Sequence, residues 1–99
     1  MLLLPERVTL DEAPATLRML AQALAREAEP VVVADASGLR RFDSAVLAVL
    51  LECRRLAEAA GKGFAVRQPP AKLVELSRLY GIDEALPPPV ASPAPATAG

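Results

Sequence analysis

The feature that most constrains the fold is an unbroken apolar run near the middle of the chain, Val31-Val32-Val33-Ala34, which ends in Asp35. A continuous run rich in β-branched residues is typical of a central strand that is buried on both faces. A helix-length segment follows, and then a second apolar strand at residues 64–66. Because a strand, a crossover and a second strand of this spacing pair in parallel, the order predicts a right-handed βαβ unit.

Shorter patterns in the first third of the chain predict further elements. Residues 2–4 and 7–10 are β-prone, and Pro5-Glu6 between them predicts two strands joined by a tight turn. Leucines then recur at helical spacing, so we expect an amphipathic helix over residues 15–28.

Two more helices are expected in the second half of the chain. A long helix over residues 44–60 begins where Asp43 or Ser44 offers a side-chain oxygen as a cap, and a last helix runs from Pro69-Pro70 to Gly81. Together these elements predict an α/β fold, in which α-helices pack against a small mixed β-sheet of about four strands.

The ordered part of the chain is expected to be one domain over residues 1–86. With 99 residues, the chain is long enough for one modest domain and too short for two. The remaining segment, residues 87–99, reads PPPVASPAPATAG and contains five prolines and no charge. Such a segment buries little apolar surface, so we expect a disordered tail.

The composition excludes several classes of function. A net charge of −1 gives no general field that would attract a nucleic acid. Cys53 is the single cysteine and the chain has no histidine, so the usual zinc and nucleophile–imidazole sites cannot be assembled. No glycine-rich phosphate-binding loop occurs either. We therefore expect no cofactor and no metal. An enzyme that pairs the carboxylates of Asp35 and Asp43 is disfavoured, because acidic residues at strand and helix ends are usually caps.

The expected location is the cytoplasm. A single cysteine fits a reducing compartment. The apolar start at residues 1–4 is interrupted at once by Pro5, so it is too short for a signal peptide or a membrane span. We expect no direct insertion into a membrane.

The expected helix over residues 44–60 carries the most information about function. Its outward side would present Ser44, Ala48 and Arg55, with Leu47 and Leu51 along one margin, where an ordinary surface helix is polar. This stripe predicts a contact patch for another protein, unless a neighbouring helix of the same domain covers the two leucines. The core face would contain Val46, Val49, Leu50, Cys53, Leu56, Ala57 and Ala60.

The segment VVVADASGLRRFDSAVLAVLLECRRLAEAAGKGFAV, residues 31–66, resembles the STAS domain (sulfate transporter and anti-sigma factor antagonist). That family places a hydrophobic strand ending in Asp before a loop, a short Asp-Ser or Asp-Thr motif and a long helix. Here the motif is Asp43-Ser44. The later LVELSRLYGIDEALP, residues 73–87, looks like the end of the MlaB-like branch, a subunit of the Mla phospholipid-transport ABC transporter. The resemblance covers about residues 1–87.

The resemblance implies a non-catalytic subunit that binds the cytoplasmic ATPase subunit of a lipid-transporting ABC complex, and regulates or stabilises it in phospholipid trafficking and outer-membrane lipid asymmetry. Such a protein would be peripheral to the inner membrane through its partners. On this hypothesis the loop at residues 37–43 and the start of the following helix make the contact. The expected partner-binding residues are Ser37, Arg40, Arg41, Asp43, Ser44, Leu47, Ala48, Leu51 and Arg55.

The alternative within the same family is an anti-sigma factor antagonist that binds a serine kinase. In that branch the motif is Asp-Ser-Ser-Gly and its second serine is phosphorylated, whereas this chain has Ala45 at that position. Ser44 matches the hydroxyl that the MlaB-like branch keeps, which favours the transporter subunit. Val46 stands where both branches usually have glycine, and Ser37 and Ser44 remain as hydroxyls for a kinase.

Overall fold

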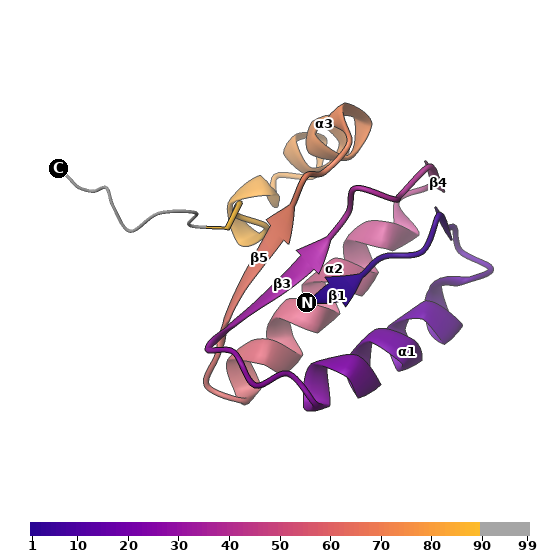
Figure 1. The fold of residues 1–99 in the computed structure, drawn as a ribbon. Helices are drawn as coiled ribbons and strands as arrows, with labels where there is room; N and C mark the ends of the chain where they lie inside the picture. Colours follow the sequence, from indigo (N-terminus) through magenta and orange to yellow (C-terminus); the bar gives the residue numbers. More distant parts are fainter. Residues whose placement is uncertain (90–99) are drawn as a thin grey trace, which may run out of the picture.

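The computed structural model describes residues 1–89, and the remainder of the predicted tail, residues 90–99, lies outside this range. The elements follow one another in the order strand, strand, helix, strand, strand, helix, strand, helix (Figure 1). Their bounds are β1 (Leu2–Leu3), β2 (Arg7–Val8), α1 (Ala13–Ala25), β3 (Val31–Asp35), β4 (Arg41–Phe42), α2 (Ala45–Ala59), β5 (Gly63–Arg67), α3 (Ala71–Leu79) and a short 3-10 helix, η1 (Asp83–Ala85).

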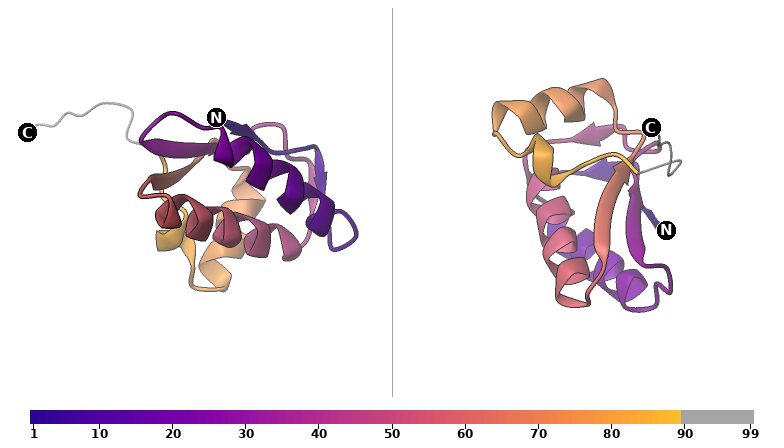
Figure 2. Two further views of the ribbon diagram at one scale, coloured as in Figure 1. Left: turned by 90° about the horizontal axis from the view of Figure 1, so that it is seen from below. Right: turned by 90° about the vertical axis from the view of Figure 1, so that its left-hand side faces the viewer.

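The main sheet is three strands wide, in the order β1-β3-β5, and both pairings are parallel. In β3 the side chains of Val32 and Ala34 point inward and are fully buried, because helices α1 and α2 lie side by side against that face of the sheet (Figure 2). The predicted βαβ unit is confirmed as β3, α2 and β5. The α/β fold with helices packed against a small sheet is confirmed with it.

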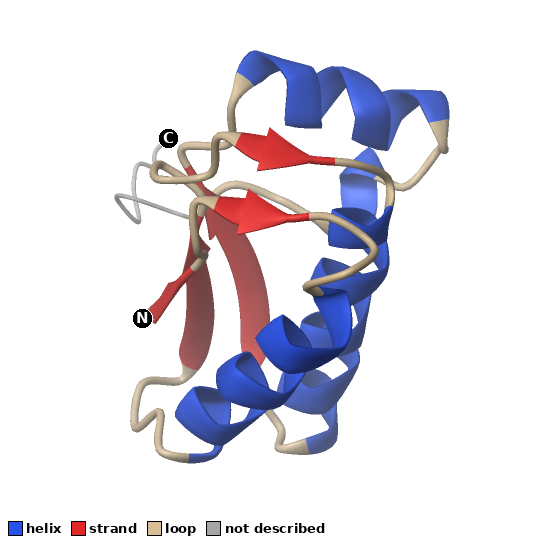
Figure 3. Ribbon diagram, turned by 90° about the vertical axis from the view of Figure 1, so that its right-hand side faces the viewer, coloured by secondary structure: helices blue, strands red, loops and turns tan. Residues whose placement is uncertain are grey.

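A second sheet pairs β2 with β4, also in parallel, and lies between α3 and the start of α1 (Figure 3). Both strands predicted in residues 2–4 and 7–10 are present, as β1 and β2, and each pairs with a segment further along the chain. The described residues hold five short strands in two parallel sheets, whereas we expected about four strands in one mixed sheet. Strands of two residues are too short to form a stable hairpin with each other.

The helices agree with the sequence prediction except at their ends. Helix α1 begins two residues earlier than expected, at Ala13, since Pro14 fits a first turn in which no N–H donor is needed. It ends three residues earlier, at Ala25. Helix α2 differs from the prediction by one residue at each end.

Leu47 corrects the predicted contact patch. Its side chain is 4% exposed and belongs to the hydrophobic core, so the expectation that it faces solvent is wrong. A helical wheel gives the direction of a side chain but not the neighbour that lies there. In this fold α1 packs along α2, and Leu47 is part of the core cluster that the helices and strands enclose together. Leu51, one turn further along α2, is half-buried and lies outside the core cluster.

The start of α2 is held by Asp43 and not by Ser44. One carboxylate oxygen of Asp43 accepts a hydrogen bond from the N–H of Ala45 at 2.9 Å, and the other accepts one from the N–H of Leu10 at 3.1 Å. Ser44 occupies the cap position, but its hydroxyl caps no N–H group of the described helix. Of the two caps that the sequence allowed, the structure therefore uses the carboxylate.

This difference predicts the stability of two alanine variants. We expect Asp43→Ala to lower the free energy of unfolding by about 1 kcal/mol, because it removes a cap and the link to Leu10. Ser44→Ala is expected to change it by less than about 0.5 kcal/mol. Urea unfolding followed by circular dichroism measures both. Equal losses in the two variants would show that the hydroxyl also caps the helix in solution.

The thiol of Cys53 lies in the middle of the core and is fully buried, as the sequence predicted. Burial raises its pKa to about 11, because a thiolate would lose its hydration there, and the nearby carboxylate of Glu52 adds to the rise. The thiol is therefore protonated and unreactive at neutral pH.

The raised pKa of Cys53 predicts a loss of stability in alkali. The unfolded chain releases the thiol proton from about pH 9, whereas the folded chain keeps it to about pH 11, so folding binds a proton between these values. The free energy of unfolding should be unaffected by this group below pH 9, and should fall by up to about 2 kcal/mol as the pH rises to 11. Denaturant titrations at several pH values test this. Cys53→Ala is the control, and it should lack this component of the pH dependence.

Candidate partner-binding surface

The loop between β3 and β4 is fixed at its start by two hydrogen bonds. The carboxylate of Asp35 accepts the N–H of Ser37 at 2.9 Å, and the N–H of Ala36 donates to the carbonyl of Arg67 at 2.9 Å. The bond from Ser37, together with the charge of Arg67, lowers the pKa of Asp35. Leu39 is buried beneath the loop. Ser37 is exposed on the surface of this anchored loop.

Arg40 and Arg41 are exposed on the segment that enters β4. Both of their N–H groups donate to the carbonyl of Glu6, at 2.8 and 2.9 Å. The pairing of β2 with β4 then sets Arg7 directly beside Arg41. One shallow depression is lined by the side chains of Glu6, Arg7, Arg40 and Arg41. Glu6 is the acidic residue among these four, and its carboxylate is only loosely paired, at 4.0 Å from Nε of Arg40. The sequence analysis missed Glu6 and Arg7, because only the pairing of β2 with β4 brings them here.

The outward side of α2 presents a ridge of side chains at successive helical turns. We call Ser44, Ala48, Leu51 and Arg55 the α2 ridge. Ser44, Ala48 and Arg55 are exposed, and Leu51 is half-buried. Small side chains thus occupy the first two positions of the ridge, where another backbone can approach closely.

The charged end of the α2 ridge is neutralised within the helix. Nε of Arg55 donates to both carboxylate oxygens of Glu52, at 3.0 and 3.1 Å, and this pairing lowers the pKa of Glu52. Arg54 pairs in the same way with Glu58 at 3.0 Å, one turn apart. Arg55 was expected to be a rim residue for a partner's carboxylate. To bind a partner's carboxylate, Arg55 would have to give up its contact with Glu52.

Leu10 is an exposed apolar residue beside the start of α2 that the sequence analysis did not select. Its side chain is 73% exposed, and its N–H group is bound to Asp43 at 3.1 Å. It therefore lies next to the residues that begin the α2 ridge. In the sequence it looked like the end of a strand, so no pattern distinguished it from a core leucine.

The carboxylates of the loop region have structural uses. Asp35 and Asp43 each accept backbone N–H groups, and the pKa of Asp35 is lowered, whereas a general acid needs a raised one. Residues 1–89 contain no cluster of three acidic or cysteine side chains that is arranged to hold a metal ion. Among the same residues, no helix has the length and the apolar character needed to cross a membrane.

Comparison with known proteins identifies the family. The family model described as "Mlab, STAS domain" matches residues 1–88, which include both sheets, all three helices and the loop before β4. A search of curated proteins finds no match. The match covers most of the chain and agrees with the α/β architecture, so the chain belongs to the STAS domain family and is a STAS-type regulatory domain.

Proposed function

We propose that this protein is the STAS subunit of an Mla-type lipid-transport ABC transporter, in which it binds and regulates or stabilises the cytoplasmic ATPase subunit. The match to the MlaB STAS family over residues 1–88 supports this function. The protein would act in phospholipid trafficking that maintains outer-membrane lipid asymmetry. It would lie in the cytoplasm, held at the inner membrane by its partners.

The observation that carries the proposal is the α2 ridge. Helix α2 is anchored by its core side, where Val46, Leu50 and Cys53 are fully buried, so its outward side is a rigid platform. Ser44 and Ala48 allow a partner helix to approach closely, and Leu51 supplies apolar area in the middle of the contact. Rigid, pre-ordered surfaces lose little entropy on binding.

The hydroxyl of Ser44 suits a contact across the interface. Asp43 already holds the start of the helix, so the hydroxyl can donate or accept a hydrogen bond without weakening its own fold. Arg40 and Arg41 are exposed on the segment just before Ser44. They would orient an acidic surface of the partner more than they strengthen binding.

The alternative is an anti-sigma factor antagonist that binds a serine kinase. The exposed hydroxyls of Ser37 and Ser44 are the observations in its favour. Against it, Ala45 stands at the position that the kinase modifies in that branch. Incubation with the serine kinases of the source organism, followed by mass spectrometry, separates the two functions, since phosphate on Ser44 would support the alternative.

We predict that Leu51→Asp abolishes co-purification with the ATPase subunit and leaves the domain folded. A carboxylate in the centre of an apolar contact is desolvated without a partner, which costs about 2 kcal/mol or more, or at least about a thirtyfold loss of affinity. The readout is co-expression with a tagged ATPase subunit and circular dichroism of the isolated variant.

Two variants serve as controls. Leu79→Asp changes an 80%-exposed leucine on α3, so binding should persist. Leu47→Asp places a charge in the core and should unfold the domain. If Leu51→Asp is folded and binds as well as the wild type, the α2 ridge is not the interface. Because Ser44→Ala is expected to keep its stability, a loss of binding in that variant would assign the hydroxyl to the interface.

A further inference from the structure

The face of the main sheet that points away from α1 and α2 carries two exposed apolar residues, Leu3 and Val31, although Ala65 on the same face is buried. Alternation along the strands turns Leu3, Val31, Val33 and Ala65 to this face. Leu3 is 65% exposed and Val31 is 45% exposed, and no helix in residues 1–89 covers them (Figure 2). Parallel sheets are normally covered on both faces, so an open apolar face of this kind indicates a missing layer.

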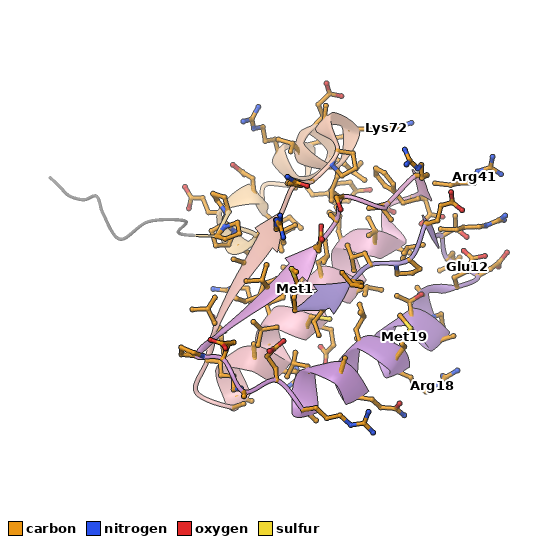
Figure 4. The ribbon with its side chains drawn as sticks, in the orientation of Figure 1. Met1, Glu12, Arg18, Met19, Arg41 and Lys72 are labelled. Carbon is orange, nitrogen blue, oxygen red and sulfur yellow. The ribbon has the colours of Figure 1, made fainter. Side chains whose placement is uncertain are left out.

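Charged groups lie at both ends of this face. Glu27 and Glu29 precede β3, and the carboxylate of Glu27 is paired with the N-terminal ammonium. At the other end Arg67, the last residue of β5, lies beside Asp35 of β3. Nη1 of Arg67 lies 3.7 Å from the sulfur of Met1, so the guanidinium extends back across the sheet toward β1. Met1 lies at the start of β1 (Figure 4). A shallow depression joins the two ends, lined by Met1, Glu27, Glu29, Val31, Val33, Arg67 and Pro89.

We propose that this open face binds a second copy of the same chain. A two-fold axis that lies between the two sheets near Val33, parallel to the sheets and perpendicular to β3, would set the two β3 strands antiparallel, face to face. The apolar centres would then cover each other, and Arg67 of each copy would meet Glu29 of the other. One surface thus supplies both halves of the contact, as an isologous interface requires.

The expected dimer is weak. The face is three strands wide and β3 is five residues long, so the contact is smaller than the roughly 800 Å² per partner of a standard stable interface. We expect dissociation on the order of 10–100 μM, where small transient interfaces are found. The α2 ridge faces away from the sheet, so the dimer would present two ridges on opposite sides. The proposal does not depend on the partner that the ridge binds.

Analytical ultracentrifugation of the full chain from about 1 μM to 1 mM tests the proposal, since this range brackets the expected dissociation constant. The wild type should change from monomer to dimer with concentration. Leu3→Lys should weaken association about a hundredfold, because each copy loses one buried leucine and each loss is worth about tenfold. The control, Leu79→Lys on α3, changes a leucine that is 80% exposed and lies on another element, and it should dimerise as the wild type does.

A charge exchange tests the orientation of the two copies independently of Leu3. Arg67→Glu and Glu29→Arg should each weaken association at least about fivefold, since like charges then meet, and the double variant should recover most of it. Circular dichroism confirms that each variant is folded.

Three results would overturn the proposal. These are a wild type that stays monomeric to 1 mM, a Leu3→Lys variant that dimerises normally, and a charge exchange without recovery. If Leu3→Lys abolishes binding of the ATPase subunit while the wild type is monomeric, the face belongs to that partner. Leu51→Asp should leave the dimer intact, so failure of the dimer and failure of the ATPase contact are separate outcomes.

Discussion

The pairing of β3 on both of its edges is the interaction on which the rest of the structure depends. Its register with β1 and β5 brings Leu2, Ala34 and Val66 into one buried row across the sheet. The strand also places the candidate surface. The carbonyl of Asp35 accepts the N–H of Leu4 at 3.0 Å and its carboxylate holds the next loop, so a shift of β3 would move the loop and the start of α2 together.

Local patterns were enough to predict β3 and α2 closely. The β-branched run is continuous and the segment before Gly61 has a helical periodicity, so local sequence indicates where each element begins and ends. The pairings of β1 and β2 were not predictable in this way. Strands of two residues have no period, and their partners lie some thirty residues away, so only the closed fold selects them.

The candidate surface could be predicted only in part, because local patterns again do not show which segments the fold brings together. Ser44, Ala48 and Arg55 were placed on the outward side of the helix, and the structure shows them there. Leu47 was misplaced, since a helical wheel carries no information about the neighbouring elements that enclose a side chain. Leu10 was missed because a hydrogen bond across 33 residues brings it to Asp43. Tertiary contacts, which no local pattern encodes, therefore decided which apolar residues are free to meet a partner.

The division of roles between Asp43 and Ser44 follows from their side chains. A carboxylate has two oxygens, and here one accepts from the helix start while the other accepts from Leu10, whereas a hydroxyl has a single oxygen. With the cap supplied by Asp43, the adjacent serine need not turn inward. A short Asp-Ser motif can thus hold a helix and present a polar group to a partner. Because the apolar face of the sheet lies on the other side of the same thin domain, a contact at the α2 ridge leaves that face accessible.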